Sequence, residues 1–245
     1  MRAPPSLARR LALQSLLLLA PATLLAGDYA HAIDGPPNAY DGYAASYDSL
    51  DDGPAAKALG LPQLRAEAVR RCQGRVLEVG CGTGLNLPFF DTRRVSLLTA
   101  VDLSPGMLGE WQASAARLRA EGRLPPVEFA RMDATRLPLP SNTFDCVLDT
   151  FSLCVFDDPS AALREMVRVC KPGGKIILLE HQRSSTPGLG AYMDFTAPAA
   201  ARMGGKGCVY NQDVDALLKE AGATLVSKQE SLLGVVALFE AKPAA

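Results

Sequence analysis

Short apolar segments alternate with helix-like segments along most of this 245-residue chain. The strand-like segments are rich in Val, Ile and Leu, and they cover residues 75–79, 95–102, 126–133, 144–153 and 175–181. Near-continuous apolar strands that are separated by amphipathic helices are typical of a parallel sheet covered on both faces. The pattern therefore predicts an α/β fold.

The C-terminal part of the chain predicts how the sheet ends. Strand-like segments at 223–231 and 234–241 are joined by only a few residues. So short a connection cannot form a parallel crossover, so the final strand should run antiparallel. The predicted fold is Rossmann-like: a mostly parallel, seven-stranded sheet with helices on both faces and a reversed terminal β-hairpin.

Helices are expected in the segments between the strands. The helix-like segments are 55–72, 104–122, 158–170 and 211–222, and a further helix should open at 85–90. Ser104 is placed as an N-cap, with Pro105 in the first turn. Tyr210 and Asn211 either cap the last helix or touch the substrate, and capping is the stronger expectation for Asn211.

The composition argues against some classes of function. The net charge is −1 and there is no dense Lys/Arg run, so electrostatic binding of nucleic acid has little support. Cysteines stand at positions 72, 81, 146, 154, 170 and 208, and no pair has CxxC spacing. We expect reduced, mostly structural thiols and no metal site, since the chain has only two histidines, His31 and His181.

The N-terminus, residues 1–32, has the layout of a targeting or anchor segment. Arg2, Arg9 and Arg10 precede an apolar run at 11–26, and Ala30–Ala32 matches a small-x-small cleavage site. The run is short for a spanning helix. A signal peptide, a transit peptide, a monotopic anchor bent at a proline and an ordinary helix remain alternatives.

Three glycines, Gly80, Gly82 and Gly84, follow the first strand in the sequence RVLEVGCGTGLN. A dinucleotide-binding turn reads GxGxxG, but Leu85 stands where its last glycine belongs. By itself this pattern also fits a tight strand-to-helix turn. The turn should lie at the carboxyl edge of the sheet, where ligands bind in such folds.

Acidic residues on successive strands sharpen this prediction. Glu78 stands within an apolar strand, where an unpaired carboxylate is costly. Asp102 ends the second strand and can accept both hydroxyls of a ribose, and Asp133 ends the third and can bind an exocyclic amine. Together with the glycine turn, they predict a nucleoside pocket without a pyrophosphate site, fitting a nucleoside that carries an amino-acid tail.

At these motifs the chain resembles the class I S-adenosylmethionine-dependent methyltransferases. The matching stretches are VLEVGCGTGLN, LTAVDLSPGML, RMDATRLPLPSNTFDCVLDTFSLC and LREMVRVCKPGGKIILLEH, and YDGYAASYD looks like the N-terminal cofactor lid of that family. The resemblance implies a helical lid at 33–72 and a methyltransferase domain at 73–245. The cofactor contacts that it implies are Tyr40, Tyr47, Glu78, Gly80, Cys81, Gly82, Gly84, Asn86, Asp102, Leu103, Met107, Asp133, Ala134, Thr150 and Phe151.

The acceptor is predicted to be a small, hydrophobic molecule. The segment DTFSLC lacks the Asn-Pro-Pro-aromatic motif of adenine and amide N-methyltransferases, and residues 185–207 form only a short, apolar insertion. LLEHQRS and GCVYNQD resemble the branch that contains membrane-anchored alkyl-thiol methyltransferases, near quinone C-methyltransferases and phospholipid N-methyltransferases. The acceptor classes are therefore a thiol, a quinol or a lipid amine.

His181 ends the fifth strand and is the candidate catalytic residue, either as a base or as a substrate contact. A structural histidine is the alternative. The protein as a whole could also bind S-adenosylmethionine without catalysis, as an assembly or regulatory protein. Reduced cysteines and the need for the cofactor favour an organelle interior, such as a chloroplast or thylakoid, or association with a membrane surface.

Overall fold

The computed structural model describes residues 38–202 and 207–244. The targeting or anchor prediction for residues 1–32 lies outside the described residues. Within them, one sheet has the strand order β3-β2-β1-β4-β5-β7-β6. The strands are β1 (Gly74–Val79), β2 (Val95–Asp102), β3 (Val127–Arg131), β4 (Phe144–Thr150), β5 (Cys170–His181), β6 (Ala223–Ser231) and β7 (Val236–Pro243).

The sheet has the predicted topology. Strands β3, β2, β1, β4 and β5 pair in parallel, and β7 pairs antiparallel with both β5 and β6. Only a short 3₁₀ turn, η5 (Leu232–Gly234), joins β6 to β7, so the reversed terminal hairpin is confirmed. Strands β1 and β4 lie side by side, and the direction of the strand order reverses between them. In open α/β sheets, ligands bind at such a reversal point.

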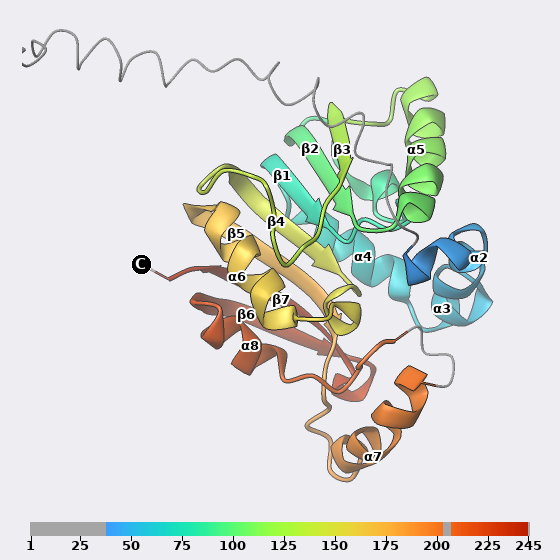
Figure 1. Cartoon of the computed structure of the whole chain (residues 1–245), viewed down its shortest axis with the longest axis vertical. Helices are drawn as coiled ribbons and strands as arrows, with labels where there is room; N and C mark the ends of the chain where they lie inside the picture. The colour runs from blue at the N-terminus through green and yellow to red at the C-terminus, as the bar shows by residue number, and fades with distance from the viewer. Residues whose placement is uncertain (1–37, 203–206, 245) are drawn as a thin grey trace, which may run out of the picture.

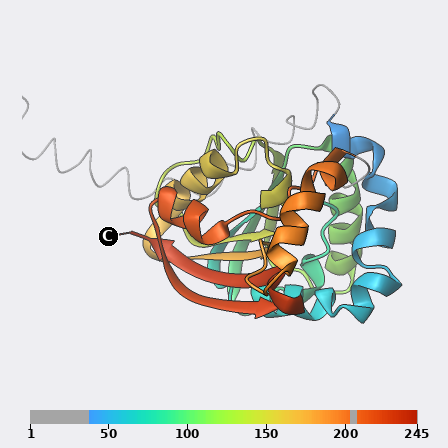
Figure 2. The same cartoon turned by 90° about the horizontal axis from the view of Figure 1, so that it is seen from below.

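Helices cover both faces of this sheet (Figures 1 and 2). On one face, α6 (Pro159–Val169) and α8 (Val214–Glu220) pack on a core that includes Phe144 and Phe239. On the other face, α4 (Leu61–Arg70) and α5 (Pro105–Ala120) pack on a second core around Trp111 and Leu98. The remaining helices are η2 (Ala39–Gly42), α2 (Ala44–Asp51), α3 (Pro54–Ala58), η3 (Leu87–Phe89), η4 (Leu153–Val155) and α7 (Leu189–Arg202).

Two local predictions were wrong. The expected helix opening at 85–90 is only the 3₁₀ turn η3, because Pro88 restricts the residue before it and Leu87 and Phe90 are both buried on the core. The cap of α8 is Asp213, whose Oδ1 accepts a hydrogen bond from the backbone N–H of Ala216 at 3.0 Å. Asn211 instead bonds to α7, as described below.

Other local features agree with the sequence. Ser104 caps α5 and accepts a hydrogen bond from the backbone N–H of Met107 at 3.1 Å. Pro105 occupies the first turn of that helix. Across residues 38–202 and 207–244, no helix combines the length and apolarity that crossing a bilayer requires.

Candidate functional site

A cavity of about 460 Å³ lies at the carboxyl edge of the sheet, beside the ends of β1, β2 and β4. Most of the predicted cofactor residues line it: Tyr40, Tyr47, Gly80, Gly82, Asp102, Leu103, Met107, Asp133, Ala134, Thr150 and Phe151. The other predicted residues, Glu78, Cys81, Gly84, Asn86 and His181, are not among its lining residues. The fold thus brings together side chains from five separate segments of the chain.

The glycine turn contributes backbone to this cavity. Gly80 and Gly82 have φ values of +64° and +55°, a left-handed geometry that glycine adopts without strain. Nothing lies within 4 Å of the position that a Cβ on Gly82 would take, so the space above it is open to a ligand. A Cβ on Gly80 would overlap the Ser152 side chain.

Gly84 and Cys81 have other neighbours. A Cβ on Gly84 would lie 2.7 Å from a Leu87 side-chain carbon and 3.2 Å from Trp111, so this glycine makes room for core packing. The Cys81 side chain is buried in the core beneath the turn, and its backbone N–H donates to the Val101 carbonyl at 3.0 Å. Of the three glycines, Gly80 and Gly82 line the cavity and Gly84 does not.

Asp102 is fixed at the end of β2 by backbone donors. Its Oδ2 accepts from the Gly82 N–H and its Oδ1 from the Ser104 N–H, both at 2.9 Å. Burial raises the pKa of this carboxyl above its usual value, although these N–H groups favour the charged form. The carboxylate lines the cavity and keeps lone pairs for two further donors, such as the hydroxyls of a ribose.

A buried polar network lies below the glycine turn. Asn86 donates from Nδ2 to Glu78 Oε1 at 2.7 Å and to Thr150 Oγ1 at 2.9 Å. Arg65, on α4, donates from Nη1 to the same Thr150 oxygen at 2.7 Å, and its guanidinium lies 4.8 Å from the centre of the Phe151 ring. No sequence pattern pointed to Arg65, because an arginine on an amphipathic helix is normally exposed, whereas here it is buried.

Glu78 is the most unusual member of this network. Its side chain is 1% exposed, and Oε2 has no hydrogen-bond partner among the described residues. Burial raises the pKa of Glu78 to about 7, against the opposing effects of Asn86 and Arg65. A buried, half-satisfied carboxylate next to a ligand cavity fits the ammonium group of an amino-acid tail. Glu78, the open backbone at Gly82 and the Asp102 carboxylate therefore lie close together along the carboxyl edge of β1 and β2.

The N-terminal helices are held against the site by two aspartates. Asp41 accepts from the Ser104 hydroxyl at 2.5 Å and from the Gly106 N–H at 2.9 Å. Asp48 accepts from the Thr83 hydroxyl, in the glycine turn, at 2.5 Å. These contacts place Tyr40 and Tyr47 on the cavity wall. The lid at 38–51 is thus anchored to both the α5 N-terminus and the glycine turn.

The opposite wall of the cavity combines apolar side chains with a carboxylate, as expected for a site that holds a nucleobase. Met107 is buried and Leu103 is 43% exposed, and both line the cavity together with Ala134. Asp133 is exposed, and its Oδ1 accepts from the N–H and the hydroxyl of Thr135 at 2.8 Å and 2.7 Å. Its other oxygen has no such bond and is available to an amine donor.

His181, like Arg65, lies against the Phe151 ring. The His181 and Phe151 rings have their centres 5.0 Å apart, and His181 Nδ1 is 3.9 Å from Cys208 Sγ. Cys208 Sγ is in turn 2.7 Å from Cys154 Sγ. The close contact with Cys154, together with His181, lowers the pKa of Cys208 to about 5, and the contact with Cys208 together with burial raises the pKa of Cys154. Sequence spacing could not reveal this cluster, because its members come from three distant segments.

Two buried carboxyls lie beneath the same edge. Asp149 accepts from the Ser152 hydroxyl, and Glu180 Oε1 accepts from the Ser152 N–H at 3.2 Å. Burial raises the pKa of Asp149 to about 7, and burial together with the charge of Asp149 raises the pKa of Glu180. Both raised pKa values favour a protonated state of the pair, and the hydrogen bonds to Ser152 hold the start of η4 beneath the cavity.

Helix α7 replaces the predicted apolar insertion and projects from the sheet (Figure 1). Asp194 pairs with Arg183 at 2.9 Å and accepts from Asn211 Nδ2 at 3.1 Å, and Thr196 shares a hydrogen bond with Tyr210 at 2.6 Å. Tyr210 and Asn211 therefore hold α7 rather than cap α8.

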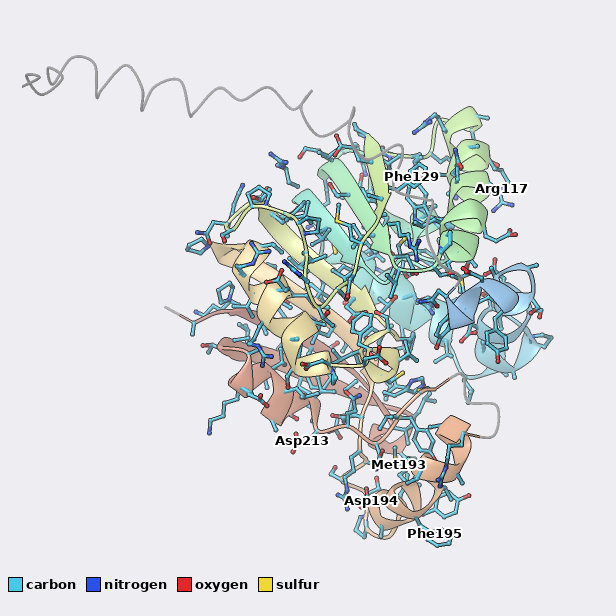
Figure 3. The ribbon with its side chains drawn as sticks, in the orientation of Figure 1. Arg117, Phe129, Met193, Asp194, Phe195 and Asp213 are labelled. Atoms are coloured by element: carbon cyan, nitrogen blue, oxygen red, sulfur yellow. The ribbon has the colours of Figure 1, made fainter. Side chains whose placement is uncertain are left out.

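The two sides of α7 differ in exposure. Met193 is 2% exposed, whereas Phe195 is 84% exposed and points away from the rest of the molecule (Figure 3). An apolar side chain so exposed is open to contact with an apolar surface.

Several known proteins are similar to this chain in sequence. A family model described as "Methyltransferase domain" matches residues 77–178. The chain is 31% identical over 188 residues to the demethylmenaquinone methyltransferase of Clavibacter sepedonicus, covering 69% of this chain and 74% of that protein. It is 28% identical over 198 residues to the mitochondrial methyltransferase OMS1 of Saccharomyces cerevisiae, covering 76% of this chain and 42% of that one.

A shorter match involves a lipid-modifying enzyme. The phosphatidylethanolamine N-methyltransferase of Cereibacter sphaeroides is 40% identical over 108 residues, which cover 44% of this chain and 51% of that protein. The chain spans between 42% and 62% of the length of several curated relatives that it matches.

Solved structures share the fold. The [4+2]-cyclase SpnF superposes with a TM-score of 0.64 at 21% identity, covering 86% of this chain and 98% of that one. The magnesium protoporphyrin IX methyltransferase of Synechocystis PCC 6803, solved with bound SAH, gives a TM-score of 0.58 at 19% identity, covering 86% and 90%. The predicted Rossmann-like fold and the predicted cofactor, S-adenosylmethionine, are confirmed at the level of the family. The chain belongs to the class I S-adenosylmethionine-dependent methyltransferases and is related to the quinone C-methyltransferases among them.

Proposed function

We propose that this chain transfers the methyl group of S-adenosylmethionine to a small, hydrophobic acceptor. The observation that carries the proposal is Glu78, whose buried and half-satisfied carboxylate adjoins the open glycine turn. Such a carboxylate is costly in an empty site and favourable beside an ammonium group. The cofactor tail would place that ammonium group there.

The remaining cofactor contacts follow from the cavity wall. The Asp102 carboxylate binds the ribose hydroxyls, and Leu103 and Met107 pack on the adenine, with Asp133 and the Ala134 backbone at its edge. Thr150 and Phe151 flank the methyl-bearing end of the tail. Tyr40 and Tyr47 close the lid side and exclude water.

The acceptor is expected to enter beside Phe156, Asp157 and Gly207, which line the part of the cavity formed by the η4 region and the segment after α7. The bound cofactor supplies a methyl group on a positively charged sulfur that is already a good leaving group. The acceptor atom forms the new bond to carbon, while the carbon–sulfur electron pair returns to sulfur. The chain therefore contributes mainly proximity and alignment.

An acceptor that arrives protonated must also lose its proton. His181 is the candidate base, because it adjoins Phe151 at the same edge of the sheet. Where the acceptor is a neutral amine, the proton can instead leave to solvent after transfer.

The acceptor class is a quinol, a thiol or a lipid amine. The names of the relatives support a quinone-type or phospholipid acceptor, since one is a demethylmenaquinone methyltransferase and another a phosphatidylethanolamine N-methyltransferase. The exposed rings of Tyr192 and Phe195 on α7 support work at a membrane surface, where such acceptors are found. The mitochondrial relative supports an organellar location.

A second candidate is binding of S-adenosylmethionine without methyl transfer, in an assembly or regulatory role. It is favoured by the similarity to SpnF, because a cyclase with this architecture shows that the fold serves reactions other than methyl transfer. The two candidates make opposite predictions for turnover.

The test is a radiolabelled methyl-transfer assay with the full chain and a panel of quinols, alkyl thiols and phospholipid vesicles. S-adenosylhomocysteine binding is measured in parallel by calorimetry. Label in one acceptor class, lost in Glu78→Gln, is the expected result. Tight cofactor binding without label in any acceptor would favour the non-catalytic candidate, and no binding at all would overturn both.

A further inference from the structure

Three metal-ligating side chains meet beside the cofactor cavity. Cys154, His181 and Cys208 each present a ligand atom, and these atoms all lie within 4.8 Å of one another. They come from η4, from the end of β5 and from the segment that follows α7. The residues next to them in the chain, Val155 and Gly207, line the cavity.

The backbone around this cluster is held by hydrogen bonds. The Val209 N–H donates to the Cys154 carbonyl at 2.8 Å, which joins the returning segment directly to η4. The Arg183 N–H donates to the Gln212 carbonyl at 2.9 Å, which joins the same segment to the end of β5. The three ligands are thus positioned by the fold and not by chance contact of mobile side chains.

We propose that Cys154, His181 and Cys208 form a binding site for a thiophilic divalent cation of the zinc class. Two thiolates and one neutral imidazole are a ligand set that Zn²⁺ prefers, and three protein ligands leave one tetrahedral position open. Two thiolates balance the charge of the cation. A neutral set of cation and ligands matters at this position because Cys154 is buried and lies next to the carboxyl pair Asp149–Glu180.

The distances require only small side-chain movements. Ligands of one tetrahedral Zn²⁺ stand about 3.5–3.8 Å apart, given Zn–S near 2.3 Å and Zn–N near 2.0 Å. The separation of His181 Nδ1 from Cys208 Sγ is already 3.9 Å. The two sulfurs, 2.7 Å apart, must separate by about 1 Å. Rotation of Cys208, which is half-buried, provides this movement.

The ion would connect the segment that follows α7 to the carboxyl edge of the sheet. Cys208 lies in the segment that Tyr210 and Asn211 tie to α7, whereas Cys154 and His181 belong to the body of the sheet. Coordination through Nδ1 also places the imidazole proton on Nε2, so His181 then donates a proton rather than accepting one. The metal-bound chain and the metal-free chain therefore differ in how the acceptor is handled.

The test uses the full chain, reduced and stripped of metal with a chelator, and titrated with Co²⁺ as a spectroscopic probe for Zn²⁺. We expect one equivalent of Co²⁺, intense tetrahedral absorption with thiolate-to-cobalt charge transfer, and displacement by Zn²⁺. Cys208→Ser should strongly reduce the charge-transfer absorption, because one of the two thiolates is lost. It should also weaken Co²⁺ binding by about 100-fold or more. His181→Gln should weaken it to a smaller extent and shift the ligand-field bands.

Cys170→Ala is the matched control, since Cys170 is also a free, buried thiol but lies outside the cluster. It should titrate like the unmodified chain. Cys208→Ser is preferred to Cys154→Ser because the half-buried position is less prone to unfold, and circular dichroism checks the fold of both.

Two results would overturn the proposal. One is absence of thiolate-to-cobalt absorption in the reduced chain. The other is a Cys154–Cys208 disulfide that reforms after reduction and blocks the titration, seen as a mass lower by two hydrogens. Because this readout needs no methyl transfer, it stands apart from the proposed function, whose failure would appear as absence of label in every acceptor while cobalt binding stays intact.

Discussion

Asn86 donates a hydrogen bond to Glu78 over 2.7 Å and so satisfies one carboxylate oxygen, while the other, Oε2, is buried and has no partner within residues 38–202 and 207–244. This arrangement explains why the pKa of Glu78 rises to about 7 even though Asn86 and Arg65 both favour the charged form. The free-energy cost of burying the charged carboxylate exceeds the stabilisation that these two neighbours provide. A cationic ligand would reverse the balance.

The first prediction is that cofactor affinity depends on the protonation of Glu78. In the free chain its pKa is about 7, so the carboxyl is mostly protonated at pH 5.5. An ammonium ligand favours the carboxylate, so binding releases a proton. Affinity for S-adenosylhomocysteine should therefore rise with pH from 5.5 to 7.5, by up to about tenfold per unit below the pKa.

Calorimetry in two buffers of different ionisation enthalpy measures the released proton directly. Glu78→Gln should bind more weakly at pH 7.5 and lose most of the pH dependence. Glu121→Gln, an exposed ion-pair carboxyl at the end of α5, is the control and should behave like the unmodified chain. Equal pH slopes in Glu78→Gln and the unmodified chain would remove the tail-binding role.

The second prediction concerns Asp102. Asp102→Asn keeps an oxygen that can accept from Gly82 or Ser104, whereas Asp102→Ala leaves both N–H groups without their acceptor. Losing one charged hydrogen bond to the ribose costs about 1.5–3 kcal/mol, or roughly 10- to 100-fold in affinity. Calorimetry should show this loss in both variants, with a lower melting temperature only in Asp102→Ala. Unchanged affinity in both would exclude the ribose contact, and tight binding of NAD would overturn the cofactor assignment.

The third prediction tests the lid. Asp41 accepts three hydrogen bonds, from Ser104, Gly106 and Asn38, and so holds η2 on the α5 N-terminus. Asp41→Ala should free residues 38–51, seen as faster amide hydrogen exchange there, and should weaken cofactor binding by about tenfold while core exchange stays slow. Asp52→Ala removes an exposed ion pair with Lys57 and is the control. Unchanged exchange at 38–51 would mean that the lid is held by other contacts.

These lid contacts show where sequence patterns stop being informative. The seven strands, the reversed hairpin and the Ser104 cap follow from local rules of period, connection length and capping, and the structure has them. Asp41 and Asp48 act through partners about 35 to 65 positions away in the chain. No local pattern marks such pairs.

The same reason explains the other misses. The helix expected at 85–90 failed because tertiary packing of Leu87 and Phe90 and the proline between them outweighed a helix-like composition. Arg65 looked like a surface residue of an amphipathic helix until Thr150 and Phe151 supplied its partners. Cysteine spacing could not reveal the cluster of Cys154, His181 and Cys208, because it forms only when three segments meet.

The fourth prediction is a fall in stability as pH rises. The pKa of Asp149 is about 7 in the folded chain, against about 3.9 in an unfolded chain. The folded state therefore holds a proton that the unfolded state has lost between these values. Since the pKa is raised on folding, its contribution is fully present below about pH 4 and disappears as pH passes 7. The raised pKa of Glu180 acts in the same direction.

Urea denaturation between pH 5 and 8 measures this effect. The free energy of unfolding should fall by roughly 1.4 kcal/mol per pH unit for each retained proton. Glu180→Gln should flatten the slope, because its amide can donate to the Asp149 carboxylate without titrating. Glu121→Gln again serves as the control. A slope that is the same in Glu180→Gln would show that the carboxyl pair does not hold the retained proton.

The last prediction separates the roles of His181. In the metal-free, reduced chain, His181→Gln should lower methyl transfer to a thiol or phenol by about 10²–10⁴-fold, which is the usual contribution of a positioned base. Affinity for S-adenosylhomocysteine should barely change, since His181 adjoins Phe151 and Cys208 and does not line the cofactor cavity. The loss should shrink as pH approaches the acceptor's own pKa, because solvent then supplies the anion. Cys208→Ser is the matched variant: it removes the nearest neighbour of Nδ1 but leaves the imidazole, so it should retain the pH profile of the unmodified chain. A small rate effect that is equal at every pH would mark His181 as structural, and alignment by Thr150 and Phe151 would then carry the reaction.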